Sequence, residues 1–229
     1  MVRVELIAHT PDPQGVVAAA ARLCYSEAGI EAIRESQPAG RVSGFLALLQ
    51  EAGHLSPLEH ASFTFYLEGF SRVTTHQLVR HRLASYSQQS QRYVRVDSND
   101  FVLPPSVRVS PAARAEYERA LEVTATSYRR LMELGVPRED ARYCLPQAVA
   151  SRLVLTMNAR ELLHFFELRT CRRAQWEIRL LALLMLRQAR KVAPALFRLA
   201  GPDCLTRGEC RQGKYSCGRL GKPVSGEGP

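Results

Sequence analysis

An arginine-rich segment carries the residue types best suited to binding an anion. The stretch from Gly69 to Val96 holds five arginines and two histidines but no acidic residue, and amide and hydroxyl side chains stand between its arginines. A guanidinium is planar and always charged, while Gln and Ser add neutral donors and acceptors, so the set suits a phosphate attached to a base or sugar. A solvated charged face is the alternative interpretation of the same residues.

A second set of polar side chains follows a helical spacing. Asn158-Ala159-Arg160-Glu161 has the spacing of a capping box and predicts a helix that runs through Arg169. His164 falls one turn after Arg160 on the same face. Arg169 could stabilise negative charge that develops on a bound substrate, because a guanidinium keeps its proton at neutral pH. Plain structural roles stay open, namely a helix cap, a packed histidine and a cation at the helix C-terminus.

The order of these residues resembles the signature of the flavin-dependent thymidylate synthases. In that family an Arg-His-Arg triplet is followed after seven residues by Ser and two positions later by Arg, and the matching residues here are Arg80, His81, Arg82, Ser90 and Arg92. The series Asn158, Arg160, His164 and Arg169 also matches, as do the segments 53–60 and 141–146. The resemblance runs from about Ala52 to Arg190 in consistent order.

The resemblance implies two sets of site residues. The residues expected to bind dUMP, with Arg169 as the catalytic one, are Gln77, Arg80, Gln88, Gln89, Ser90, Arg92, Arg142 and Arg169. The residues expected to bind FAD are His54, Ser56, Glu59, Arg80, His81, Arg82, Gln88, Asn158, Arg160 and His164.

The resemblance also implies the reaction and the assembly. The enzyme would methylate dUMP at C5 to give dTMP, with 5,10-methylenetetrahydrofolate as carbon donor and NADPH as reductant through FAD. It would form a homotetramer with active sites between subunits. A basic nucleic-acid-binding module without catalysis is the alternative, because the net charge is +9 and the pI about 9.6. The sequence has no basic tract interleaved with aromatic residues, so no nucleic-acid partner is predicted.

The six cysteines are not expected to supply a nucleophile. Other thymidylate synthases attack uracil with a thiolate in a Pro-Cys-His context, which Cys144 lacks although it lies two residues from Arg142. The tail cysteines Cys204, Cys210 and Cys217 fit no common zinc spacing and have no evident fourth ligand, so no metal is predicted.

Strands and helices are mixed without regular alternation, which predicts an α+β fold with a mixed, largely antiparallel sheet packed with long helices. This is the thymidylate synthase-complementing protein fold that the resemblance implies. Neither a Rossmann motif nor a P-loop is present in the sequence. Strands are predicted at 2–7, 62–67, 93–96 and 153–157, and helices at 15–24, 41–52, 71–82, 110–135, 158–169 and 174–192. Ser56-Pro57-Leu58-Glu59 predicts a further capped helix start.

The predicted organisation is a single domain over residues 1–200, followed by a Cys- and Gly-rich tail over 201–229 that is loop or partly disordered. No run of about 18 apolar residues exists, so no membrane span is expected. The first residues, Met1 to Glu5, are typical of a strand rather than a signal peptide, and the predicted location is cytoplasmic.

Overall fold

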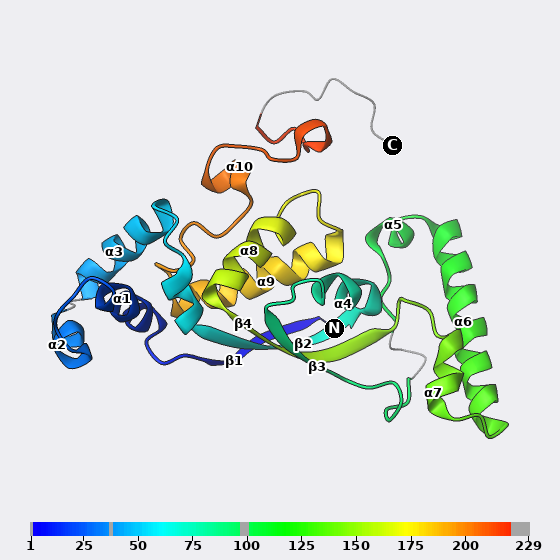
Figure 1. The fold of residues 1–229 in the computed structure, drawn as a ribbon. Coiled ribbons are helices and arrows are strands. Elements are labelled where there is room, and N and C mark those ends of the chain that lie inside the picture. Colours follow the sequence, from blue (N-terminus) through cyan, green and yellow to red (C-terminus); the bar gives the residue numbers. More distant parts are fainter. Residues whose placement is uncertain (1, 37–38, 97–100, 221–229) are drawn as a thin grey trace. The chain divides into compact units, whose positions relative to one another are not determined.

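The computed structural model describes residues 2–36, 39–96 and 101–220 (Figure 1). Its centre is a four-stranded sheet in the order β1-β2-β4-β3. The strands are β1 (Arg3–His9), β2 (Ser62–Ser71), β3 (Ala84–Gln88) and β4 (Ala150–Asn158). In each neighbouring pair a backbone hydrogen bond joins the end of one strand to the start of the other: Thr10 N to Ser62 O (3.0 Å), Arg72 N to Val149 O (3.0 Å) and Gln89 N to Arg152 O (2.9 Å). All three pairs are therefore antiparallel, which agrees with the predicted fold class.

The sheet has one apolar and one polar face, because side chains alternate along each strand. Phe63 and Phe65 of β2 are fully buried, whereas Thr64 between them is half-buried and meets Thr156 of β4 at 2.9 Å between hydroxyl oxygens. Helices α8 (Ala159–Arg169) and α9 (Trp176–Val192) pack against each other. Phe63 contacts Phe197, whose ring also meets Phe166 of α8, so the aromatic core lies between the sheet and α8.

The chain divides into two compact units built from interleaved segments. The first unit contains residues 66–80 and 86–154, and its helices are α4 (Arg72–Leu78), α5 (Pro105–Arg108), α6 (Pro111–Glu133), α7 (Arg138–Ala141) and the 3-10 helix η2 (Arg142–Cys144). The second unit contains residues 4–65, 81–85 and those from 155 onward. Besides α8 and α9, its helices are α1 (Pro13–Leu23), α2 (Ile30–Glu35), α3 (Ala39–Glu51), α10 (Asp203–Thr206) and the 3-10 helices η1 (Ser56–His60) and η3 (Gly213–Tyr215). One domain over 1–200 with a separate tail stays a prediction.

Two local predictions were wrong. Residues 93–96 are not a strand, because the backbone N–H groups of Tyr93 and Val94 both bond to Ser90 O and close a turn. The strand in this region is β3, which sequence analysis missed because its residues Ala-Ser-Tyr-Ser-Gln show no apolar alternation. Ser56 is not a helix cap: η1 begins at Ser56 itself and makes no side-chain cap bond. The backbone N–H of Leu58 instead donates to the backbone oxygen of Leu55 at 3.1 Å.

Residues 201–220 of the tail, predicted to be loop or partly disordered, contain two short helices. Within 201–220 the chain forms α10 and η3, with glycines at positive φ at the turns between them. No helix among the described residues is both long enough and apolar enough to cross a bilayer.

Candidate functional site

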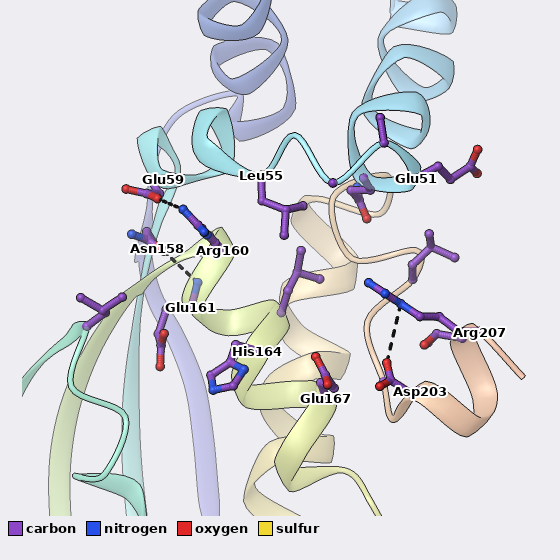
Figure 2. A pocket seen from close by; sticks show the side chains of 18 residues that line it. Glu51, Leu55, Glu59, Asn158, Arg160, Glu161, His164, Glu167, Asp203 and Arg207 are labelled. Atoms are coloured by element: carbon purple, nitrogen blue, oxygen red, sulfur yellow. Dashed lines mark hydrogen bonds and ion pairs between the residues drawn. The ribbon is translucent and has the colours of Figure 1, made fainter. Parts of the chain in front are cut away.

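A cavity of about 890 Å³ opens in the second unit (Figure 2). Its walls come from the end of α3, the loop before η1, the first turns of α8, and α10. The lining contains both apolar and polar side chains. It includes Leu55, Glu59, Leu83, Asn158, Arg160, Glu161, Leu163, His164, Glu167, Leu199, Asp203 and Arg207. A large, partly apolar pocket with a few polar groups is the usual form of a cofactor or ligand site.

The N-terminus of α8 faces this cavity because β4 ends at Asn158 and the helix starts at once. The Asn158 side chain accepts a hydrogen bond from Glu161 N at 2.9 Å, so the predicted N-cap is confirmed. Arg160 donates to the Glu59 carboxylate across the cavity mouth. Both side chains are about half exposed, so the ion pair adds little stability, but it joins η1 to α8 (Figure 2).

Three side chains beside the cavity form a hydrogen-bonded chain in which His81 and Glu161 are buried and Arg169 is half-buried. Arg169 Nε donates to His81 Nε2 at 3.1 Å, and His81 Nδ1 lies 3.1 Å from Glu161 Oε1. Since Nε2 accepts a hydrogen bond from Arg169, the ring proton of a neutral imidazole must sit on Nδ1, and this N–H donates a hydrogen bond to the Glu161 carboxylate. His81 is only 4% exposed and its ring packs edge-on against Phe165.

The electrostatics of this chain follow from its burial. Burial, followed by the charges of Arg169 and His164, lowers the pKa of His81 from 6.5 to about 4. Burial also raises the pKa of Glu161 above its ordinary value and lowers the pKa of Arg169. Neutral His81 is thus a fixed acceptor that holds the Arg169 guanidinium in one orientation at the end of α8.

The predicted FAD-binding residues fall into three groups. Glu59, Asn158, Arg160 and His164 line the cavity. His54, Ser56 and Arg82 are exposed and adjoin lining residues in sequence, and His81 is buried behind the cavity. Arg80 and Gln88 belong to the first unit.

The predicted dUMP-binding residues other than Arg169 all belong to the first unit. Glu139 of α7 brings two of them together: its carboxylate accepts from Arg92 Nε at 2.8 Å, and its backbone oxygen accepts from Arg142 Nε at 3.0 Å. Gln88 Nε2 donates to Ser151 Oγ at 3.0 Å. The Arg92 and Arg142 segments are 50 positions apart in the numbering, so α7 is what unites them.

Sequence analysis missed several residues of the site. From the sequence, Glu161 was predicted only as part of a capping box. In the structure its carboxylate is the buried hydrogen-bond partner of His81. The acid and base that α10 adds to the cavity wall, Asp203 and Arg207, gave no signal because the segment reads as a loop.

Comparison with known proteins agrees with this geometry. Residues 5–195 match the model of the family described as "Thymidylate synthase complementing protein". A protein of Geobacter sulfurreducens named flavin-dependent thymidylate synthase is 54% identical over 220 residues, which cover 95% of this chain and 94% of that protein. A Clostridium tetani protein of the same name is 45% identical over 234 residues, covering 95% and 94%.

The chain belongs to the family of flavin-dependent thymidylate synthases. The resemblance predicted from the sequence is confirmed, and so is the expectation of a methyltransferase of this class. A solved structure adds the fold: the Streptomyces cacaoi UMP/dUMP methylase PolB, bound with 5-Br dUMP, superposes with a TM-score of 0.77 at 29% identity, covering 86% of this chain and 93% of that one. Because the family is flavin-dependent, a flavin is the cofactor to compare with the mixed apolar and polar lining of the cavity.

Proposed function

We propose that this member of the family converts dUMP to dTMP by reductive methylation at C5. In this proposal 5,10-methylenetetrahydrofolate supplies the carbon and NADPH supplies the reducing equivalents. The observation that carries the proposal is the hydrogen-bonded series Glu161–His81–Arg169, with buried His81 at its centre, because it fixes the Arg169 guanidinium. The protein's relatives are flavin-dependent thymidylate synthases, in which such a group has a use.

Arg169 would act as an electrostatic stabiliser. Methylation at C5 requires electron density to build up on the uracil ring and its oxygens before the new bond forms. A guanidinium beside N3 and O2 lowers the energy of that charge, and it does so best when no reorientation is needed. The bond from Arg169 Nε to His81 Nε2 supplies this fixed orientation, and the Glu161 carboxylate in turn fixes the His81 tautomer.

The binding of dUMP would use the remaining arginines. Arg80, Arg92 and Arg142 offer charged, planar donors that match phosphate oxygens, while Gln77, Gln88, Gln89 and Ser90 offer neutral donors. Glu139 holds both Arg92 and Arg142 through Nε, which fixes the plane of each guanidinium. Ser90 is expected to bind rather than to act as a nucleophile, since its hydroxyl accepts from Arg92 N at 3.2 Å and a serine nucleophile needs a base to activate it.

FAD fits the cavity by size and by chemistry. About 890 Å³ lies at the upper end of the range of cofactor pockets, roughly 300–1,000 Å³. Leu55, Leu83 and Leu163 offer apolar surface for a ring system, and Arg160 and His164 offer donors to phosphate or ring oxygens. When bound, the flavin supplies hydride-transfer chemistry. His54, Ser56, Glu59, Arg82 and Asn158 would complete its binding.

The assembly and the location remain part of the proposal. Family members of this kind suggest a homotetramer with active sites between subunits and a cytoplasmic enzyme. Tyr93 and Tyr143, 72% and 85% exposed beside Arg92 and Arg142, are large apolar groups of the kind that a partner subunit covers.

The proposal is tested with the purified, untagged chain. The expected result is a yellow protein whose flavin absorbance is bleached by NADPH and which forms dTMP only when dUMP and methylenetetrahydrofolate are both present. UMP in place of dUMP is the matched control for the sugar. A protein that binds flavin but forms no dTMP under these conditions would contradict the proposed reaction.

A further inference from the structure

Four thiols gather in the second unit, on the side of α10 and the α8–α9 loop. Cys204 lies in α10, Cys210 and Cys217 follow in the tail, and Cys171 comes two residues after the end of α8. Burial, followed by the Cys171 thiol, raises the pKa of Cys204, and the Cys217 and Cys210 thiols act in the same direction, so each of these three thiols lies near Cys204. We call these residues the thiol cluster. All four are free thiols in the structure.

Independent contacts hold the tail against the loop that carries Cys171. The Arg173 guanidinium, two residues after Cys171, lies 5.8 Å above the Tyr215 ring. Arg211 Nη1 lies 3.8 Å from the carboxylate of Glu167 in the last turns of α8. The tail is thus held against α8 and the loop after it at two points, both of which follow Cys210 in the sequence.

The tail also folds tightly around its own cysteines. Arg211 Nε donates to Asp203 at 2.8 Å, which joins the Cys210 turn to the start of α10. Cys210 Sγ lies 3.4 Å from Ser216 Oγ, beside Cys217. Gly208, Gly213 and Gly218 each follow a cysteine within four residues and have φ of 72°, 51° and 72°. These left-handed turns need glycine and reverse the chain after each thiol.

No apolar core accounts for this compactness. The large apolar residues of 201–220 are Leu205, Tyr215 and Leu220, and they are 55%, 49% and 42% exposed. A segment of this size without a core needs another source of order, and structural metals are a common one. Thiolate ligands favour Zn²⁺, which takes four of them in tetrahedral geometry.

We propose that Cys171, Cys204, Cys210 and Cys217 bind one Zn²⁺ ion as a four-thiolate structural site that fastens the tail to the end of α8. Each thiol gives up its proton to solvent as its sulfur binds the ion, and no oxidation takes place. Among the described residues no three His, Cys, Asp or Glu side chains stand in coordinating geometry, so the thiols must turn inward on binding. Sequence analysis predicted no metal because the fourth ligand, Cys171, lies on the far side of α9 in the sequence.

The site would also shape the cavity described above. Cys204 is flanked by Asp203, and Asp203 and Thr206 of α10, with Arg207 directly after it, belong to the cavity wall. An ion bound at Cys204 would therefore set the position of this wall.

Zinc content is the direct test. The untagged full-length chain, purified without chelators and under reducing conditions, should contain about one equivalent of zinc per chain by plasma mass spectrometry. Each of the variants Cys171→Ser, Cys204→Ser, Cys210→Ser and Cys217→Ser should lose most of it. Cys24→Ser and Cys144→Ser, which alter thiols outside the cluster, are matched controls and should keep it.

Two further measurements keep the test independent of variant folding. Co²⁺ loaded into the native chain should give a sulfur-to-metal charge-transfer band and the strong visible bands of a tetrahedral thiolate site. The tail offers trypsin Arg207, Arg211 and Lys214, and cleavage there should become at least tenfold faster after the metal is removed. A chain that takes up no metal, zinc content unchanged in all four variants, or a disulfide found by intact mass in place of the ion would overturn the proposal.

Discussion

At the scale of single residues, the unusual feature is a histidine that works as an acceptor. His81 sits in the middle of the most cationic stretch of the chain, yet the structure buries it and keeps it neutral. Its two nitrogens serve Arg169 and Glu161, 88 and 80 positions away in the sequence. A charged His81 would repel the arginine that it holds, so the low pKa and the geometry support each other.

Replacing the guanidinium should affect turnover far more than folding. We expect Arg169→Ala to lower kcat for dTMP formation by about 10²–10³-fold, because a preoriented stabiliser of developing charge is lost. Arg169→Lys should recover little, since an ammonium cannot reproduce the planar donor that meets His81 Nε2. Steady-state kinetics with flavin absorbance as a loading control checks this. Unchanged kcat in a fully loaded Arg169→Ala variant would remove the catalytic role from this residue.

The depressed pKa of His81 predicts a loss of stability in mild acid. The unfolded chain protonates His81 near 6.5 but the folded chain only near 4, so the stabilising contribution is complete above 6.5 and is lost as pH falls to about 4. The raised pKa of Glu161 acts in the opposite sense, because acid removes the cost of its buried carboxylate.

Urea unfolding of the native chain and of His81→Gln isolates the histidine. Gln can accept and donate at similar positions but does not titrate. Relative to this variant, the native free energy of unfolding should decrease by roughly 2–3 kcal/mol between pH of about 7 and about 4. A difference between the two proteins that does not change with pH would contradict the assigned protonation state.

At the scale of elements, the start of α8 has two roles that one substitution can separate. Asn158 caps the helix through its side-chain oxygen and also lines the cavity. Asn158→Ala should cost about 1 kcal/mol of stability and weaken flavin binding, since cap and polar group are both lost. Asn158→Asp should keep the cap but still weaken flavin binding, because the amide donor is gone and a negative charge is added.

Ser110→Ala gives the matched control for that prediction. Ser110 caps α6 through a 3.3 Å bond from Ala113 N and does not line the cavity. It should cost about the same stability and leave flavin affinity unchanged. Thermal unfolding and flavin titration of the three variants measure both effects. Equal flavin affinity in all three would show that Asn158 is only a cap.

The elements also mark how far a sequence can predict this fold. Amphipathic α9 and the alternating β2 were predictable because their apolar period is long and regular. Strand β3 was not, since its polar residues gain order by pairing with β4, which no local pattern encodes. The same limit applies to the site: Asn158 and Arg160 carry a local signal, whereas the contact of Glu161 with His81 depends on tertiary packing.

At the scale of the whole molecule, basic residues are interspersed with acidic ones, although the net charge is +9. The four arginines of α6 are balanced by four glutamates on the same helix, in the pairs Arg114–Glu118, Arg119–Glu116, Arg129–Glu122 and Arg130–Glu133. These exposed pairs contribute little stability, but they lessen the cationic surface that a nucleic-acid-binding module would need.

The proposed assembly is measurable directly. Light scattering on the eluting protein should give a mass about four times 25.6 kDa. Tyr143→Asp should shift it towards smaller species, because an exposed aromatic group suited to a partner surface is replaced by a charge. Glu118→Gln on the exposed face of α6 is a control that also changes the charge by one unit, in the opposite direction. A native chain that elutes and scatters as a monomer would contradict the homotetramer.

The cavity wall built by α10 has a practical consequence for selective inhibition. The family model matches residues 5–195, whereas Asp203 and Arg207 lie beyond that range and still line the cavity. A compound that reaches both side chains would address a surface on which family members can differ. Such a compound would draw affinity from contacts with the tail as well as from contacts with the signature residues.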